Sequence, residues 1–446
     1  MSENTSLPAS PPTFRRAVSR WEIVAFSVND VIGSGVYLLP AAAAAVLGAA
    51  SLGAVVLAGV AVLLLVLCFV EAASHFDRAG GAYLYTRHAF GELVGFEVGW
   101  MTWIARVSSV ASLSVGFAQA LTYLWPAAQT GWGRGLGITL PLLALTVINV
   151  IGVKSGVRTA VFLSISKTVP LLIFIAAGAF AFSGAVFAAA GRAPRTGTLS
   201  EAALLLLFAY AGFENTAAPA GEFKNPRRDV PFALIAQIVI VTLIYSAVQG
   251  VALGTLPGVA SAKTTLADAA RLFLGSWGGW LMTFGAVVSI LGTNSNTVLS
   301  GPRYLFALAE AGFGPRVLAR LHPRFRTPWI AVLAQSAIAL PLALGGSFEG
   351  LAKLSVMARL ATYLGTAAAV PILRSKFPKT AADAVRLPGG PVIPIAAVLI
   401  CAVLAFSARI ENLVAAGVAI LVGLGIYALR REPSPSSPAG SSDEPS

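Results

Sequence analysis

The chain has 446 residues, of which 57% are hydrophobic and only 11% are charged, and its mean hydropathy is +0.79. A water-soluble domain of this size could not carry that composition on its surface, so most of the chain must lie in lipid. The net charge of +12 comes without a compact basic region. This argues against nucleic-acid binding and is typical of the Lys and Arg excess in membrane-protein loops.

The sequence offers no set of residues for a metal or a cofactor. Cys68 and Cys401 both lie inside apolar runs, and His75, His88 and His322 lie near the ends of apolar segments. Neither set can assemble a zinc site or a disulfide framework. We therefore expect no metal, no cofactor and no catalytic residues, and an intramembrane enzyme is disfavoured because it needs a nucleophile with a base, or a metal.

Apolar stretches long enough to cross about 30 Å of hydrocarbon follow one another along the chain. They lie at about 20–46, 50–75, 92–124, 134–152, 157–187, 200–221, 230–254, 277–308, 328–345, 350–373, 391–408 and 411–430. The expected fold is an all-α membrane protein with about twelve transmembrane helices. With the N-terminus inside, the cytoplasmic segments carry roughly three times as many Lys and Arg as the external ones. This bias predicts a multi-pass protein of the inner (plasma) membrane with both termini cytoplasmic.

Two of these segments are interrupted at bilayer depth. Residues 31–37 (VIGSGVY) place two glycines around a serine in the first segment, and residues 208–216 (FAYAGFENT) interrupt the sixth. Glycine weakens a helix and lets a ligand approach the backbone. Unwound backbone is tolerated in a membrane only where it lines a cavity, so interruptions at matching positions of two halves indicate a transporter site. We predict discontinuous helices 1 and 6 in a five-plus-five inverted repeat.

The backbone of such a break has a defined chemistry. The N–H groups at the start of a half-helix carry positive partial charge, and the carbonyl groups at the end of the other half accept hydrogen bonds. A break can therefore bind a carboxylate and an ammonium together, as an α-amino acid requires. The alternative for residues 33–35 is a close-packing contact of small residues, which is common in membrane helices.

Several segments resemble the amino acid, polyamine and organocation (APC) transporter superfamily, and in particular its amino acid permeases. They are residues 33–40 (GSGVYLLP), 78–83 (RAGGAY) with 89–91 (AFG), 208–214 (FAYAGFE) with 222–227 (EFKNPR), and the stretch from Arg303 and Tyr304 through Gly312 to Thr327 and Pro328. Together they run from the first expected span to the ninth. The sixth-span segment is the most specific of them.

The resemblance implies a ten-helix inverted-repeat core, two peripheral helices and alternating access around a central site. The implied substrate-binding residues are Val31, Ile32, Gly33, Ser34 and Gly35 of the first span and Phe208, Ala209, Ala211 and Gly212 of the sixth. The N–H groups of Ser34 and Gly35 would hold a carboxylate, and the carbonyl groups of Val31, Phe208 and Ala211 an amine. Phe208 would cover the substrate as an aromatic gate, although aromatic residues at helical spacing are usually packing residues.

The chain then divides into four expected regions. They are a cytoplasmic tail at 1–19, the transport core at 20–374, two peripheral transmembrane helices at 391–430, and a Pro- and Ser-rich tail at 431–446 that is too polar to bury a core.

Five ionisable residues fall at membrane depth, namely Asp30, Arg106, Lys167, Glu214 and Arg359. Each would cost several kcal/mol facing lipid, so they should face the interior and mark working parts. By resemblance, Lys167 lies where sodium binds in sodium-coupled relatives. Its ammonium would supply that charge permanently or by protonation, which predicts proton coupling without sodium. The alternative is a fixed cation that ties helix 5 to the carbonyl groups of helix 1.

The expected selectivity depends on Arg106, which the resemblance places beside the substrate side chain. A guanidinium stays charged, so Arg106 must be neutralised by Asp30, by Glu214 or by the substrate itself. A cation about 4 Å away would be disfavoured by on the order of 4 kcal/mol at an effective dielectric near 20. We therefore count Arg106 as a substrate-binding residue and expect neutral or acidic amino acids. The alternative is that Arg106 points away from the cavity.

The expected function is secondary active transport of amino acids by symport with protons. Exchange of one amino acid or amine for another stays open, as does a membrane amino-acid sensor, although sensors usually add a soluble output domain. A channel would lack the paired breaks with opposite dipoles. The expected partners are a small-molecule substrate, protons and the lipid bilayer, with no nucleic acid, and the oligomeric state is open.

Overall fold

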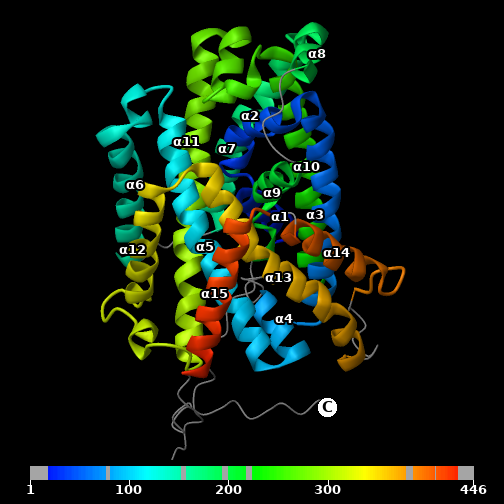
Figure 1. Cartoon of the computed structure of the whole chain (residues 1–446), viewed down its shortest axis with the longest axis vertical. Coiled ribbons are helices and arrows are strands. Elements are labelled where there is room, and N and C mark those ends of the chain that lie inside the picture. Colours follow the sequence, from blue (N-terminus) through cyan, green and yellow to red (C-terminus); the bar gives the residue numbers. More distant parts are fainter. Residues whose placement is uncertain are drawn as a thin grey trace, which may run out of the picture.

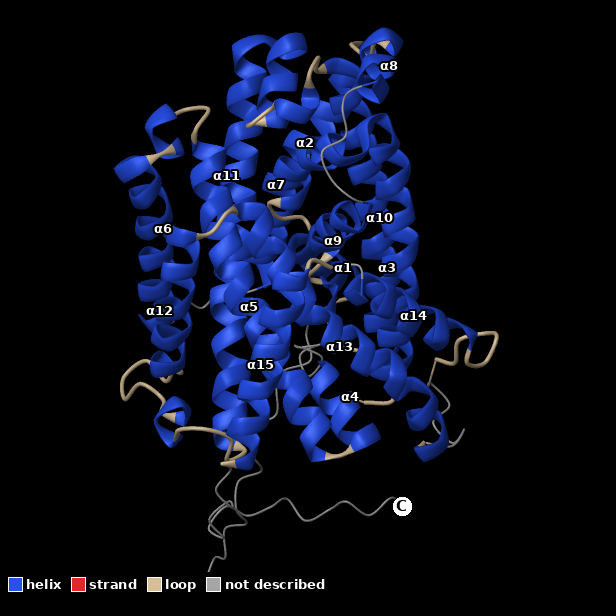
Figure 2. Cartoon of the chain, viewed as in Figure 1, coloured by secondary structure: helices blue, strands red, loops and turns tan. Residues whose placement is uncertain are grey.

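The computed structural model describes residues 19–76, 81–151, 157–192, 199–216, 224–377, 385–406 and 408–429. Helices make up nearly all of these ranges, and no strand occurs in them (Figure 2). The α-helices are α1 (Arg20–Val31), α2 (Gly35–Leu47), α3 (Ser51–Ser74), α4 (Gly81–Phe90), α5 (Glu92–Leu121), α6 (Gly131–Ile151), α7 (Val157–Phe180), α8 (Gly184–Arg192), α9 (Leu199–Tyr210), α10 (Pro226–Thr255), α11 (Thr265–Glu310), α12 (Trp329–Gly345), α13 (Phe348–Lys376), α14 (Val392–Phe406) and α15 (Ile410–Ala428). Short 3-10 turns join some of them, including η3 (Phe213–Asn215). The expected tails, apart from residue 19, and the motif residues 78–80 and 222–223 lie outside the described ranges.

Most of the predicted apolar segments coincide with a single helix, as 92–124 does with α5 and 350–373 with α13. The segment 157–187 differs, because α7 ends at Phe180 and α8 leaves it at a bend of 104°. The backbone N–H of Ser183 donates to the Gly254 carbonyl at 2.8 Å and holds the turn. Apolar composition continues through this bend, so hydropathy alone could not detect the end of the helix.

Seven helices in the described part of the chain are long and apolar enough to cross a membrane, or eight if α7 and α8 form one span. The apolar helices α12 and α14 have only 17 and 15 residues. At 1.5 Å per residue they reach about 22–25 Å, so flanking residues are needed to complete a crossing. The chain is a multi-pass membrane protein, and the count of about twelve spans stays a prediction.

The interrupted helices α1, α2 and α9 lie at the centre of the molecule, among α3, α5, α10, α11 and α13 (Figure 1). The helices α6, α12, α14 and α15 lie at its periphery. Their outward side chains are apolar and exposed, as with Leu140 of α6, Leu399 of α14 and Leu421 of α15. An apolar surface of this extent suits lipid rather than water. The buried core therefore surrounds the two interruptions.

Candidate functional site

The first interruption lies where the sequence predicts it. Helix α1 ends at Val31 and α2 begins at Gly35, with Ile32, Gly33 and Ser34 between them. The backbone N–H of Leu38 donates to the Ser34 carbonyl at 3.0 Å, which opens α2. The first N–H groups of an α-helix have no acceptor within it. The positive end of the α2 dipole therefore faces the gap between the two half-helices.

The second interruption follows Tyr210, the last residue of α9. The N–H of Ala211 donates to the Phe208 carbonyl at 3.1 Å, and Gly212 then takes a φ of +127° before the turn η3. Residues with a side chain rarely adopt this backbone conformation, so glycine is the residue that fits here. The break of α9 is thus observed, and residues 217–221 of the predicted span lie outside the described part of the chain.

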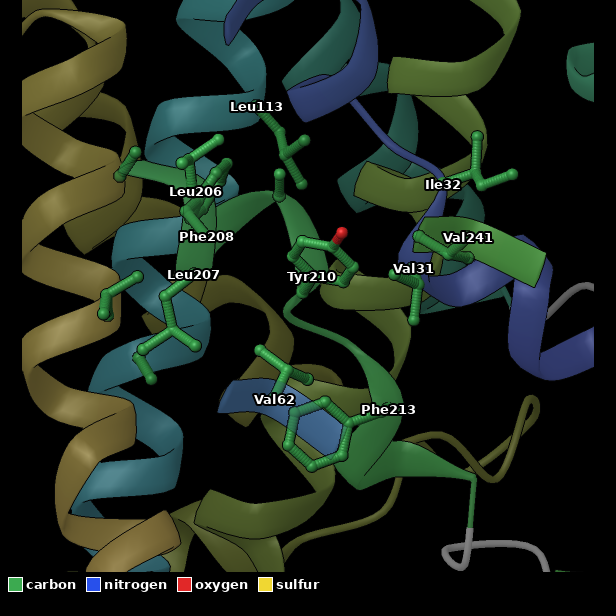
Figure 3. Packing of buried hydrophobic residues seen from close by; sticks show 14 of the residues in the cluster. Val31, Ile32, Val62, Leu113, Leu206, Leu207, Phe208, Tyr210, Phe213 and Val241 are labelled. Carbon is green, nitrogen blue, oxygen red and sulfur yellow. The ribbon is translucent and has the colours of Figure 1, made fainter. Parts of the chain in front are cut away.

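The two interruptions pack directly on each other. A Cβ atom on Gly35 would lie 2.7 Å from the Cα of Ala209, and one on Gly212 would lie 2.7 Å from the backbone oxygen of Asp30. Figure 3 shows Val31 and Ile32 of the first break near Tyr210 of the second. Both contacts need glycine because the approaching atoms belong to backbone, which cannot rotate away.

Tyr245 of α10 joins the two breaks. Its hydroxyl lies 3.1 Å from the carbonyl oxygen of Val31 and 2.9 Å from that of Ala209, and it is buried. These carbonyl groups belong to the last turns of α1 and α9. Sequence reasoning missed this residue, because a tyrosine in an apolar helix gives no signal of what its hydroxyl contacts.

A small cavity lies between these elements, with a volume of about 30 Å³. Its lining comprises Asp30, Val31, Gly33, Ser34, Gly35, Arg106, Ser109, Leu113, Phe208, Ala209, Ala211, Gly212, Thr293, Thr297 and Arg359. Every residue predicted to bind substrate is in this lining except Ile32. A volume of this size holds about one or two water molecules. A larger ligand therefore requires the surrounding helices to separate.

Phe208 and Ser34 line the cavity, one from each interruption. The Phe208 ring meets that of Phe348 edge to face, with centroids 6.0 Å apart. The Ser34 hydroxyl is buried and has no hydrogen-bond partner among the described residues. Buried polar groups normally have a partner. This hydroxyl is therefore available to a ligand at the start of α2.

Lys167 of α7 is fully buried and lies at the end of α1. Its Nζ donates to the carbonyl groups of Asn29 at 2.7 Å and Ile32 at 2.6 Å, and lies 3.3 Å from the Thr293 hydroxyl. Ser289 also donates to the Ile32 carbonyl, at 3.2 Å. A cation is favourable at the carbonyl end of a helix. Lys167 does not line the cavity, and its ammonium contacts the carbonyl groups of the first break from outside the cavity.

Arg106, Arg359 and Glu214 form one cluster, with Glu214 at its middle. Its Oε1 pairs with Nη1 of Arg359 and lies 3.7 Å from Nη2 of Arg106. Its Oε2 accepts the N–H of Gly212 at 3.0 Å and the hydroxyl of Tyr363 at 3.3 Å. One carboxylate is therefore shared by two guanidinium groups from α5 and α13. Of the partners considered from sequence, Glu214 is the carboxylate that Arg106 meets.

Asp30 has partners of a different kind. Its Oδ2 accepts from the side-chain amide of Asn215 at 2.6 Å and its Oδ1 from that of Asn296 at 3.4 Å. Sequence reasoning identified neither amide as a partner of Asp30, because both lie far from Asp30 in the chain and only the fold brings them to α1. The carboxylate lies within the cavity lining and is balanced by dipoles rather than by an ion pair in the described part of the chain.

The sequence matches the family described as amino acid permease over residues 18–424. The chain belongs to the amino acid permease family. This permease is therefore a member of the APC superfamily, as the motifs predicted. Its family and its relatives indicate a transporter rather than an enzyme.

Relatives of this permease resemble it along most of their length. The serine/threonine exchanger SteT of Bacillus subtilis (strain 168) is 33% identical over 89% of this chain and 92% of its own. The branched-chain amino acid permease BcaP of the same organism is 26% identical, with 94% and 93% covered. The methylthioribose transporter of the same organism is 28% identical, with 90% of each chain covered.

Proposed function

We propose that this permease is a secondary active transporter of α-amino acids, neutral or acidic, that works by alternating access around the central cavity. The observation that carries the proposal is the pairing of the two breaks at one cavity. The start of α2 offers N–H groups to a carboxylate, and the ends of α1 and α9 offer carbonyl oxygens to an ammonium. An α-amino acid is the small ligand that needs both the N–H groups and the carbonyl oxygens, because it carries a carboxylate and an ammonium.

The proposed architecture follows from the same elements. About twelve spans include a five-plus-five inverted repeat over residues 20–374, with the peripheral pair at 391–430. Both termini are cytoplasmic, and the membrane is the inner (plasma) membrane. The limited volume of the cavity supports alternating access, because a substrate must enter a state in which the helices lie further apart. Phe208 closes over the substrate in the occluded state.

The proposed coupling ion is the proton, with no need for sodium. Lys167 places an ammonium on two carbonyl groups at the end of α1, where a bound cation stabilises the break. In this proposal its protonation state follows the transport cycle. A permanently charged Lys167 is the competing view, in which it only ties α7 to α1.

Exchange is a second candidate function, and one observation favours it. A relative with 33% identity over most of both chains is a serine/threonine exchanger. An exchanger needs the same cavity but requires an amino acid on the far side of the membrane for each one taken up. Symport and exchange therefore use the same binding site. They differ in whether transport requires an amino acid on the far side of the membrane.

The test is uptake of radiolabelled amino acids into proteoliposomes with and without an inward proton gradient, with and without sodium, and with empty or amino-acid-loaded vesicles. Symport predicts accumulation in empty vesicles driven by the proton gradient and indifferent to sodium. Uptake only into loaded vesicles would establish exchange instead. A steep sodium dependence would overturn the coupling assignment.

Lys167→Ala tests the coupling residue, with the exposed Lys263→Ala as the control for loss of one lysine. We expect Lys167→Ala to lose gradient-driven accumulation and Lys263→Ala to retain it. Unchanged gradient-driven uptake in folded Lys167→Ala would reduce Lys167 to a structural tie.

A further inference from the structure

Outside the two breaks, the wall of the cavity comes from α5, from Thr293 and Thr297 of α11, and from α13. Helix α5 contributes Arg106, Ser109 and Leu113, which are spaced three and four residues apart and so share one face. Helix α13 contributes Arg359. A substrate whose backbone groups lie at the breaks would extend its side chain toward this wall. The chemistry of the wall therefore determines which side chains fit.

Arg359 is well supplied with partners. Its Nε lies 3.3 Å from the Ser355 hydroxyl, its Nη2 donates to Ser109 at 2.9 Å, and its Nη1 pairs with Glu214. Arg106 is not. Its Nε and Nη2 are buried without a hydrogen-bond partner among the described residues, and its side chain is only 3% exposed. A buried guanidinium with too few acceptors is costly, and Arg106 lines the cavity, so an acceptor that enters the cavity can complete its hydrogen bonds.

The charge at the centre is also unbalanced. Three buried cations, Arg106, Arg359 and Lys167, are set against two buried carboxylates, Asp30 and Glu214. Glu214 does not line the cavity, so the lining itself has two guanidinium groups and one carboxylate. A zwitterionic substrate without net charge leaves this excess in place. A substrate with one net negative charge removes it.

We propose that the substrate is an α-amino acid with a carboxylate in its side chain, held by the guanidinium of Arg106, which lines the cavity. The inference rests on the proposed function and narrows it to one substrate class. The planar fork of a guanidinium fits a carboxylate with two parallel hydrogen bonds, which is the strong form of this interaction. An amide side chain of the same size offers one weaker acceptor and leaves the charge unbalanced.

The first experiment measures binding to the purified native protein, using radiolabelled L-glutamate, L-glutamine, L-aspartate and L-asparagine. Each acid and its amide have nearly the same size, so their ratio of dissociation constants isolates the charge. We expect at least one acid to bind tenfold or more tightly than its own amide. L-serine, L-leucine and L-arginine complete the panel, and L-arginine should bind most weakly.

The second experiment assigns the effect to Arg106. Arg106→Gln should bring the ratio of acid to amide close to one. Arg87→Gln is the matched control, because Arg87 is half exposed, lies outside the cavity lining, and makes contacts with Glu92 at 3.9 Å and with the Tyr83 hydroxyl at 3.4 Å. It should leave the native ratio unchanged. Arg106→Lys keeps the charge but loses the fork, so its ratio should fall between those of the native protein and Arg106→Gln.

The outcomes separate this inference from the proposed function. Binding of neutral amino acids as tight as binding of the acids overturns the inference and leaves amino-acid transport standing. Failure of every amino acid in the panel to bind overturns the proposed function as well. A native ratio retained in folded Arg106→Gln overturns the assignment to Arg106. If that variant does not fold, the acid-to-amide ratio of the native protein decides the substrate class by itself.

Discussion

Helix α13 carries two arginines that pair with buried carboxylates, and they meet these carboxylates in different ways. Arg374 binds Glu71 of α3 through two parallel contacts, Nε to Oε1 at 2.5 Å and Nη2 to Oε2 at 2.7 Å. The loop before α14 completes this pair, since Leu387 N–H donates to Glu71 at 3.1 Å and Arg374 donates to the Gly390 carbonyl at 2.6 Å. Charges and donors are balanced there.

Arg359 instead shares Glu214 with a second arginine, Arg106, whose Nε and Nη2 have no hydrogen-bond partner in the described part of the chain. The same two residue types therefore form a closed structural link near one end of α13 and an incomplete site near its middle. The number of hydrogen-bond acceptors around each arginine, rather than the presence of buried charge, distinguishes a structural link from a binding site. Three variants test this distinction, and a fourth tests the backbone contact at the same centre.

The largest effect is expected for Glu214→Gln. It leaves two buried guanidinium groups side by side without their shared anion, and breaking a buried ion pair from one side costs about 3–5 kcal/mol. Thermal unfolding in detergent should show the loss, with Glu411→Gln at the exposed start of α15 as the control. Native-like unfolding of Glu214→Gln would mean that Glu214 does not neutralise the cluster.

Glu71→Gln should cost about 3 kcal/mol, the low end of that range, because Arg374 is partly exposed and can reach water. The expected difference is in function. Substrate selectivity of the folded protein should be unchanged, as measured by competition for labelled uptake. A change in selectivity would contradict the view that this pair is only a structural link.

Gly35→Ala tests whether the centre depends on backbone contact as well as on charge. The new Cβ would meet the Cα of Ala209 at 2.7 Å, and overpacking of this kind costs about 1–3 kcal/mol. Substrate affinity should fall along with the unfolding temperature. The control is Gly53→Ala in α3, where nothing lies within 4 Å of the added atom. If Gly35→Ala and Gly53→Ala showed the same affinity and unfolding temperature, the contact between Gly35 and Ala209 would not be needed for the site.

Arg106→Gln should have the smallest effect on stability, within about 1 kcal/mol, because it removes the cation that is in excess and leaves the Arg359–Glu214 pair intact. Unfolding of the ligand-free protein measures this. A loss as large as that of Glu214→Gln would show that Arg106 is a structural partner rather than a group kept for a ligand.

Much of the fold could be read from the order of the residues. Hydropathy located most of the long helices, though not α4, because each must hide its backbone from lipid within itself, which is a local requirement. The two interruptions could be located for the same reason, since glycine and polar residues at bilayer depth mark where that requirement is relaxed. Helix ends were less predictable, as at Phe180, where apolar residues continue through a bend fixed by the distant Gly254.

The sequence by itself determined that this chain is a helical membrane protein with two broken helices and five charges that cannot face lipid. The tertiary structure decided which charges meet. Arg106 and Arg359 come from helices far apart in the chain and converge on Glu214, and Tyr245 reaches both breaks from α10. Hydropathy and helix breaks depend on neighbours along the chain. Pairing depends on the directions of side chains from separate helices, which only packing of the whole fold defines.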